Sequence, residues 1–451
     1  MNDPATLEKI HQAQYIDGQP LEKRRVPYFN IRHMMSLNAK TAGHLTFMIH
    51  IDQDGKKQTL SYAEFNALVH QVANFLHDDL GVQRGDRVAT IAYNHAETVL
   101  IYFACWVIGA TVAPQNVTED DQRIAYILRS SESVVCLVRP EYLERAERII
   151  HGTDDGLAAP NIRAIVQFGG EPGADYLHLN SLVKNLPMTY MGDGATVKSA
   201  DDDIKSPNEA TARLDDEALL VYTSGTTGAP KGVVLTQYNL LVDAAGIAAA
   251  QGINGGQRLM CVLPIHHVNG IVVTLITPML VGGSTVLTRS FSATNFWRRI
   301  VEEKINLVSV VPTLLQFLLE YGRAQEAAGN TIFGEGVHRR GLSHFRHFIC
   351  GAGTLSVTLA REFENTFGYK ILHGYGLSET TCYSCHLPID LTWQEHQHWM
   401  QDYGYPSIGM PIAANEMAIF SSDGSGQRLG PDERGEICIR GHNVMKYYFQ
   451  R

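Results

Sequence analysis

Thr223-Ser224-Gly225-Thr226-Thr227-Gly228-Ala229-Pro230-Lys231-Gly232 is the most distinctive stretch of the chain, and it lies between two strand-like runs at 219–222 and 233–235. Glycines let a backbone fold closely around an anion, and hydroxyl groups can donate hydrogen bonds to phosphate oxygens. Lys231 adds a positive charge. The stretch is not a Walker loop, because Gly232 follows Lys231 and no Ser- or Thr-capped helix begins there. We predict a phosphate-binding loop; a flexible surface hairpin is the less favoured alternative.

Helical and strand patterns alternate on both sides of this loop. Apolar residues with helical spacing run from 65 to 76, and an apolar helix is expected at 99–108. Short buried strands are expected at 88–92, 111–113, 134–138, 162–167, 218–222, 259–263, 284–287, 307–311 and 345–349. Strands separated by helices favour mostly parallel sheets covered by helices.

The expected fold class is therefore α/β, with two helix-flanked, mainly parallel β-sheet subdomains packed in layers plus a small β-barrel-like subdomain. The layered core is expected to span 1–405. Its first subdomain covers 60–200, and its second covers 20–59 and 215–385. A polar stretch at 192–216 is interpreted as the connection between them. Strand-like runs at 415–420 and 435–440 around a turn-rich segment predict the small β unit at 406–451.

Composition excludes several classes of protein. The 451 residues carry 37 Lys plus Arg against 47 Asp plus Glu, a formal net charge of −10, and 45% of them are hydrophobic. An acidic chain without a basic tract is a poor candidate for binding nucleic acid or an anionic membrane surface. A high apolar fraction with only 19% charged residues excludes a disordered chain.

Cysteine usage and the apolar runs predict the compartment. The seven cysteines are scattered and odd in number, which favours buried, reduced thiols in a cytoplasmic protein. The start of the chain lacks the basic and apolar regions of a signal peptide. The longest uncharged apolar run, 99–113, falls short of the roughly 18 residues that indicate a membrane span.

The loop resembles the signature of the adenylate-forming superfamily, which includes acyl-CoA synthetases, peptide-synthetase adenylation domains and firefly luciferases. Other segments resemble the motifs of this superfamily in the same order along the chain: 60–65, 85–89, 109–116, 263–270 (Leu-Pro-Ile-His-His-Val-Asn-Gly), 311–314, 350–356 (Cys-Gly-Ala-Gly-Thr-Leu-Ser), 374–380 (Gly-Tyr-Gly-Leu-Ser-Glu-Thr), 408–411 and 435–441. The resemblance covers nearly the whole chain.

The resemblance implies that ATP, Mg²⁺ and coenzyme A, or a carrier-protein phosphopantetheine, are the cofactors. Its implied nucleotide-binding residues are Thr223, Ser224, Gly225, Thr226, Thr227, Gly228, Lys231, Gly351, Ala352, Gly353, His373, Gly374, Tyr375, Gly376 and Ser378. Tyr375 would present a flat face to adenine, and the 351–353 turn would approach the other side of the ring. Glu379 and Thr226 are the implied Mg²⁺ ligands. His373 stands where relatives usually carry an amide, and Ser378 where they usually carry threonine.

The implied acid pocket is formed by His267, Val268, Asn269 and Gly270, and the implied catalytic residues are Lys231, His267 and Glu379. This stretch has no Asp to pair with an α-ammonium group, so an α-amino acid is disfavoured. For His266 a structural hydrogen bond is favoured over catalysis.

Two other patterns are interpreted as coincidence. Residues 382–386 read Cys-Tyr-Ser-Cys-His, the spacing of a c-type haem attachment site, but they follow the adenylate motif directly. His386, His396 and His398 lack the second well-spaced pair that a zinc site needs. The stretch 387–405 is longer than in many relatives and is expected to shape access to the site.

The implied activity is that of an ATP-dependent carboxylate–thiol ligase. It would activate a small carboxylic acid as acyl-AMP, release pyrophosphate and transfer the acyl group to CoA. The alternatives are an acyl-AMP ligase that loads a carrier protein, a luciferase-like oxygenase, which is less favoured, and a non-catalytic nucleotide-binding homologue. The chain stops where relatives continue into a mobile C-terminal domain, so we expect slow adenylation and no thiol transfer from this chain.

Overall fold

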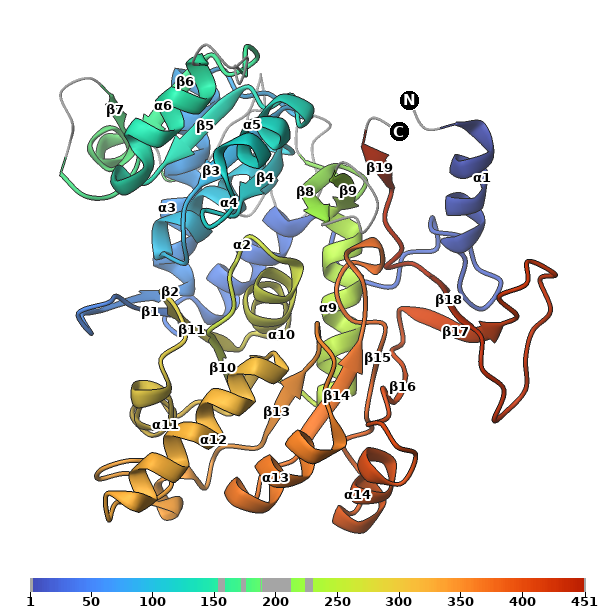
Figure 1. Cartoon of the computed structure of the whole chain (residues 1–451). Helices are drawn as coiled ribbons and strands as arrows, with labels where there is room; N and C mark the ends of the chain where they lie inside the picture. The colour runs from blue at the N-terminus through green and yellow to red at the C-terminus, as the bar shows by residue number, and fades with distance from the viewer. Residues whose placement is uncertain are drawn as a thin grey trace.

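The computed structural model describes residues 3–152, 159–171, 176–186, 188, 212–223 and 230–449. They form two large β-sheets with helices on their faces, one in the upper and one in the lower half of Figure 1. The predicted α/β class and layered architecture are confirmed. The helix α1 (Pro4–Ala13) lies on the same side as the C-terminal strands, where Gln14 Nε2 donates to the Met445 carbonyl at 2.9 Å.

The first sheet has eight strands in the order β19-β9-β8-β4-β3-β5-β6-β7. The bounds of these strands are β3 Arg87–Ile91, β4 Thr111–Gln115, β5 Val135–Val138, β6 Ala164–Gln167, β7 Leu177–His178, β8 Glu217–Thr223, β9 Lys231–Thr236 and β19 Tyr447–Phe449. The strands from β8 to β7 are parallel, and β9 is antiparallel to β8. The expected strands at 88–92, 111–113, 134–138 and 162–167 are present, each within a few residues.

The β8–β9 hairpin differs from the predicted division of the chain. Residues from 215 onward were expected in the second subdomain, but β8 pairs with β4 and extends the first sheet. The Thr111 hydroxyl also donates to the Glu217 carbonyl at 3.0 Å. Local strand patterns give the positions of strands but carry no information on which sheet each strand joins, so the pattern alone could not place this hairpin.

The second sheet has nine strands in the order β16-β15-β14-β13-β12-β10-β11-β1-β2. Their bounds are β1 Thr46–Ile51, β2 Lys57–Ser61, β10 Arg258–Cys261, β11 Ser284–Thr288, β12 Leu307–Val310, β13 His347–Cys350, β14 Ile371–Tyr375, β15 Cys385–His386 and β16 Met410–Pro411. The strands β1 and β10–β14 are parallel. Their carboxyl ends therefore meet at one edge, and the segments after β10, β12, β13 and β14 converge there.

The helices cover both sheets. On or beside the first sheet lie α3 (Tyr62–Asn74) with η1 (Phe75–Asp79), α4 (Ala96–Ile108), α5 (Asp121–Ser130), η2 (Pro140–Tyr142), α6 (Leu143–His151), α7 (Leu179–Leu182) and η3 (Val183–Asn185). The remaining helices are α2 (Ile31–Ala42), α9 (Gln237–Gln251), η4 (Asn269–Ile276), α10 (Thr277–Val281), α11 (Ala293–Glu302), α12 (Pro312–Ala327), η5 (Arg339–Leu342), α13 (Val357–Phe367), η6 (Ser378–Thr380) and α14 (Trp393–Gln401).

Helix α4 accounts for the longest apolar run of the sequence. Every residue of α4 except Glu97 is buried, and Trp106 Nε1 donates to the Ala218 carbonyl of β8 at 2.7 Å. Burying such a helix on all sides removes a large apolar surface from water, at about 25 cal/mol per Å². Within the part of the chain that the structure describes, no helix is both long and apolar enough to span a membrane.

The strands of the C-terminal segment do not form the one small β-barrel-like unit expected at 406–451: each pairs antiparallel with its neighbour, and they are divided between three sheets. The pair β17 (Asn415–Phe420) and β18 (Glu436–Gly441) forms a two-stranded sheet, at the right of Figure 1. Strand β16 extends the second sheet through β15, and β19 extends the first sheet through β9. The segment therefore ties the two large sheets together.

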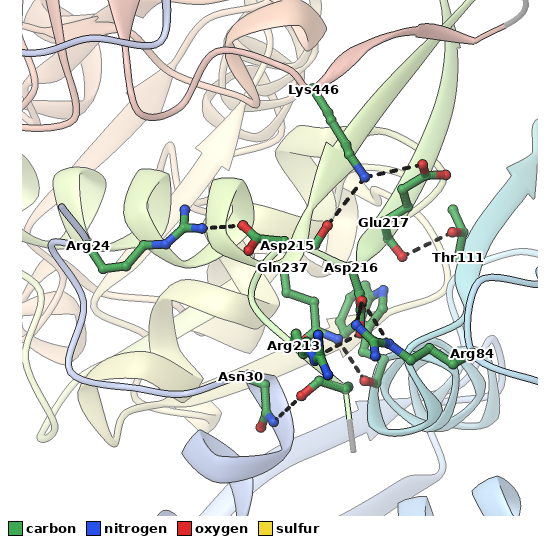
Figure 2. Close-up of polar contacts among 12 residues, drawn as sticks. Arg24, Asn30, Arg84, Thr111, Arg213, Asp215, Asp216, Glu217, Gln237 and Lys446 are labelled. Carbon is green, nitrogen blue, oxygen red and sulfur yellow. Dashed lines mark hydrogen bonds and ion pairs between the residues drawn. The ribbon is translucent and has the colours of Figure 1, made fainter. Parts of the chain in front are cut away.

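The residues just before β8 are fastened by polar contacts (Figure 2). The Arg84 Nε donates to the Asp216 carboxylate at 2.9 Å, and Arg24 pairs with Asp215. Lys446 Nζ lies 3.4 Å from the Asp215 carbonyl and 3.5 Å from the Glu217 carboxylate. These contacts fix the start of the strand whose other end is Thr223.

Candidate active site

Two adjoining cavities lie at the carboxyl edge of the second sheet. The His267 cavity has a volume of about 330 Å³ and is lined by Leu263, Pro264, His267, Val268, Asn269, Val311, Ala352, Gly376, Leu377, Ser378, Cys382 and Tyr383. The Tyr375 cavity has a volume of about 490 Å³ and is lined by Ala352, Gly353, Thr354, Leu355, His373, Gly374, Tyr375, Gly376, Tyr405, Pro406 and Ile408. Ala352 and Gly376 border both. Open α/β sheets bind ligands at this edge.

Glycines at the cavity walls allow close backbone contacts. A Cβ on Gly376 would lie 1.8 Å from the Cys382 carbonyl oxygen, and one on Gly374 would lie 2.6 Å from the Cys385 carbonyl oxygen. A Cβ on Gly351 would lie 2.7 Å from the Tyr383 ring. Gly351 therefore makes room for this tyrosine, while Ala352 and Gly353 are the turn residues that line the Tyr375 cavity. Ala352 has a φ of 58°, in the left-handed region.

His373 is held in one tautomer. A carbonyl can only accept, so the 2.9 Å contact with the Ser407 carbonyl requires His373 Nδ1 to donate. Burial lowers the pKa of His373, which keeps the ring neutral and leaves Nε2 as an acceptor. The half-buried Tyr375 ends β14, and its carbonyl accepts from Ser384 N at 2.8 Å.

Lys231 and Glu379 are brought together through Tyr448. Lys231 Nζ lies 5.3 Å from the centre of the Tyr448 ring, and the Tyr448 hydroxyl donates to Glu379 Oε1 at 2.8 Å. The Glu379 carbonyl accepts from Met445 N at 2.8 Å. Tyr448 was missed in the sequence analysis. No local sequence pattern indicated the partners of Tyr448, because they lie far from it along the chain.

The centre of the predicted phosphate loop, with Ser224, Gly225, Thr226, Thr227 and Gly228, lies outside the described residues. Its two ends are described. Thr223 and Lys231 are paired across the β8–β9 hairpin, so the segment between them leaves and re-enters adjacent strands. The Lys231 end lies beside Tyr448, and through it beside Glu379. Thr226, an implied Mg²⁺ ligand, belongs to the segment that is not described.

A buried polar network supports the segment after Glu379. The fully buried Asp243 of α9 accepts from Asn443 Nδ2 at 2.9 Å and from Tyr383 N at 3.4 Å. Asn443 Nδ2 also donates to the Thr380 carbonyl at 3.1 Å, and its own carbonyl accepts from the Thr381 hydroxyl at 2.7 Å. Thr381 has a φ of 67°, so this turn is strained and needs support. Burial raises the pKa of Asp243 well above its usual range.

The His267 cavity carries the predicted acid-pocket residues. His267, Val268 and Asn269 line it, whereas Gly270 lies behind them, where a Cβ would be 2.4 Å from the Pro264 carbonyl oxygen. Burial lowers the pKa of His267, and the nearby Glu119 carboxylate partly opposes this shift.

The hydrogen bond expected for His266 is not found among the described residues. The His266 ring packs on the His267 ring with 4.4 Å between their centres. Burial, followed by the neighbouring His267, lowers the pKa of His266 to about 3. A ring held in this way is neutral and acts as a packing residue.

The residues of the rejected haem and zinc patterns have other contacts. Cys382 and Cys385 are free and buried. His386 packs against Tyr383 with the rings tilted and 4.2 Å between their centres, and His396 Nε2 lies 2.6 Å from Glu364 Oε1 in the core. Among the described residues, no group of three or more His, Cys, Asp and Glu side chains could hold a metal ion.

Two mainly parallel sheets flanked by helices, with adjoining cavities at the carboxyl edge of the second, form an arrangement in which α/β folds bind ligands. The chain belongs to the AMP-binding enzyme family, whose model matches residues 37–449.

Curated relatives include several CoA ligases. The oxalate–CoA ligase of Arabidopsis thaliana is 28% identical over 87% of this chain and 68% of its own length. The feruloyl-CoA synthase of an Amycolatopsis species is 27% identical over 87% of this chain and 67% of its own length. The long-chain-fatty-acid–CoA ligase of Bacillus subtilis is 27% identical over 88% of this chain and 67% of its own length.

Solved structures share the fold. The anthranilate CoA ligase AuaEII in complex with anthranoyl-AMP superposes with a TM-score of 0.78 at 21% identity, over 96% of this chain and 73% of its own. The N-terminal domain of FACL13 from Mycobacterium tuberculosis gives a TM-score of 0.73 at 23% identity, over 94% and 92% of the two chains.

Proposed function

We propose that the protein is an ATP-dependent acid–CoA ligase that forms an acyl-AMP. The observation that carries this proposal is the pair of adjoining cavities, one suited to adenine and the other to an organic acid, with Ser378 on the wall of the second and Glu379 next to it in sequence. An acyl-adenylate has the same two parts, joined by a phosphate. The relatives of this protein that are named as CoA ligases or synthases support the same class of reaction.

The nucleotide would occupy the Tyr375 cavity. Tyr375 offers an aromatic face for stacking. The neutral His373 has Nε2 as an acceptor, which suits the amino group of adenine in place of the amide found in relatives. Lys231 would neutralise the β- and γ-phosphates as pyrophosphate leaves, and the Ser378 hydroxyl would donate to the α-phosphate.

The first step joins a carboxylate oxygen to the α-phosphorus and breaks its bond to pyrophosphate. In the second step a thiolate sulfur attacks the acyl carbon and AMP leaves. Charge builds on phosphate oxygens in the first step, so catalysis rests on positioning and electrostatic stabilisation. His267, at the mouth of its cavity, lies where it can border both the carboxylate and an incoming thiol.

The Glu379 carboxylate fits Mg²⁺, because the residue is half-buried, Oε1 accepts from the Tyr448 hydroxyl beside Lys231, and no hydrogen bond from a described residue occupies Oε2. Mg²⁺ commonly binds through one or two carboxylates together with substrate phosphates. When bound, it supplies charge neutralisation of the phosphate oxygens. Thr226 remains a proposed second ligand on the loop.

CoA is the proposed acceptor, with a carrier-protein phosphopantetheine as the alternative. The second step of the reaction and the location of the protein in the cytoplasm are part of the proposal. The division of the chain into 1–405 and 406–451 stays a proposal, with β8, β9 and β19 counted in the first sheet and β16 in the second.

A panel of carboxylic acids tests the proposal. We expect acid-dependent exchange of labelled pyrophosphate into ATP, and CoA thioester formation by the whole protein. A protein that transfers the acyl group to a carrier protein but not to free CoA would favour the alternative. Failure to bind any non-hydrolysable acyl-adenylate would support a non-catalytic homologue.

A further inference from the structure

The His267 cavity has walls without formal charge. Its described lining residues include no Lys, Arg, Asp or Glu, and residues 224–229 carry no charged side chain either. The pKa of His267 is lowered, so this ring is neutral near pH 7, and the charged group that acts on it is the Glu119 carboxylate. A second anionic group on a bound acid would therefore be buried without a partner and near a negative charge, which is unfavourable.

Tyr383 forms a fixed, satisfied end of this cavity. Its hydroxyl accepts from Asn269 Nδ2 at 3.2 Å, and Asn269 Oδ1 accepts from the Ser309 hydroxyl at 2.7 Å. The ring packs against His386 at an interplanar angle of 41°, and only 2% of the Tyr383 residue is exposed. Because Asn269 and Ser309 bond to each other and to Tyr383, this end of the cavity favours an apolar group over a polar one.

The ring is also held from behind. The Tyr383 ring lies close against Gly351: a Cβ on this glycine would be 2.7 Å from both the ring and the hydroxyl oxygen. The Tyr383 backbone N donates to Asp243 Oδ2 at 3.4 Å. The ring therefore has no room to withdraw as a longer acid enters. A volume of about 330 Å³ is at the lower end of the ~300–1,000 Å³ of ligand pockets.

We propose that the acid is a short or single-ring monocarboxylic acid with an uncharged, apolar tail, and that the Tyr383 ring sets the longest tail that fits. This inference rests on the proposed function, because it assigns the His267 cavity to the acid. Tyr383 is thus a specificity-determining residue at the far end of the tail.

Binding of acyl-sulfamoyladenosines, which are non-hydrolysable acyl-adenylate analogues, tests the inference by calorimetry without needing turnover. With wild type we expect affinity to rise about fourfold per methylene until the tail reaches Tyr383, and then to fall. The tail length at which affinity stops rising and begins to fall is the reversal point. In Tyr383→Leu this point should move to tails at least two methylenes longer. Tyr403→Leu, a matched change at an exposed tyrosine, should keep the wild-type reversal point.

The charge of the tail is tested on the unmodified protein. The glutaryl analogue, with a terminal carboxylate, should bind at least roughly 100-fold more weakly than its methyl ketone isostere, the 5-oxohexanoyl analogue. Equal binding of the two would overturn the uncharged-tail assignment. An unchanged reversal point in a folded Tyr383→Leu protein would overturn the role of Tyr383.

If Tyr383→Leu fails to fold, Val268→Phe replaces it. A larger side chain on the cavity wall should move the reversal point to shorter tails, and an unchanged point would count against the cavity assignment. If no analogue binds, whatever its tail, the proposed function itself fails. Binding of all analogues with no dependence on tail overturns this inference alone.

Discussion

Replacing Asp243 perturbs the support of the active-site turn without touching either cavity. The Asp243→Ala variant removes the acceptor of Tyr383 N and one of the three acceptors of Asn443 Nδ2. A buried donor left unpaired costs about 1–3 kcal/mol, and the loss of one further hydrogen bond about 1 kcal/mol. We therefore expect the free energy of unfolding to fall by about 2–4 kcal/mol, measured by urea denaturation.

Asp243→Asn separates the charge of this group from its shape. Burial raises the pKa of Asp243 in the folded protein well above its usual value, so the folded state holds the proton more tightly than the unfolded state. The stabilisation from this proton is fully present below the unfolded pKa of about 3.9 and is lost as pH rises toward the folded pKa. The asparagine has no proton to lose.

The stability of wild type relative to Asp243→Asn should therefore decrease as pH rises from 4.5, by up to about 1.4 kcal/mol per pH unit, and level off above the folded pKa. Asp54→Asn removes a carboxylate from an exposed turn and controls for the change in net charge. A stability of wild type relative to Asp243→Asn that stays constant or increases with pH would refute the reasoning.

Three further changes probe the rest of the site. Lys231→Ala should weaken ATP binding at least roughly tenfold with little change in melting temperature, because a charge-assisted contact to phosphate is worth about 1.5–3 kcal/mol. Unchanged ATP affinity, measured by calorimetry, would count against the loop assignment. Tyr448→Phe removes the hydroxyl that occupies Glu379 Oε1, so the Mg²⁺ concentration that half-saturates ATP binding should fall. A rise in that concentration would instead show that Tyr448 orients Glu379 for the ion. His396→Leu removes one of the hydrogen-bond partners of Glu364 Oε1 in the core and leaves that oxygen the Ile371 N–H, so the unfolding free energy should fall by about 1–3 kcal/mol. His398→Leu, on the exposed side of α14, should change it by less than about 1 kcal/mol, and equal effects would contradict the importance of the buried contact.

Sequence periodicity was sufficient to predict most strands of both sheets and the α/β class, because alternating buried strands and helices repeat over short distances. The same patterns could not assign β8 and β9 to a sheet. Parallel pairing joins strands far apart in the chain, such as β4 and β8, and no local pattern records which strand will be the neighbour.

The cavities were partly predictable. His267, Val268, Asn269, Tyr375 and His373 were named from motifs and line the two cavities. The groups that hold them were not predictable, because their contacts span the chain: Asp243 and Asn443 are 200 residues apart. Tyr383 was not predicted to line a cavity, because it lies within a segment whose spacing resembles a haem attachment site.

The fate of the carboxylate oxygen tests the central claim most directly. With an ¹⁸O-labelled apolar acid, ATP and Mg²⁺, attack of the carboxylate on the α-phosphorus places one labelled oxygen between the acyl group and AMP. We expect mass spectrometry to find that label in the phosphate of the released AMP, whether CoA or water takes the acyl group. Label in inorganic phosphate, with ADP as the nucleotide product, would contradict activation through an acyl-adenylate.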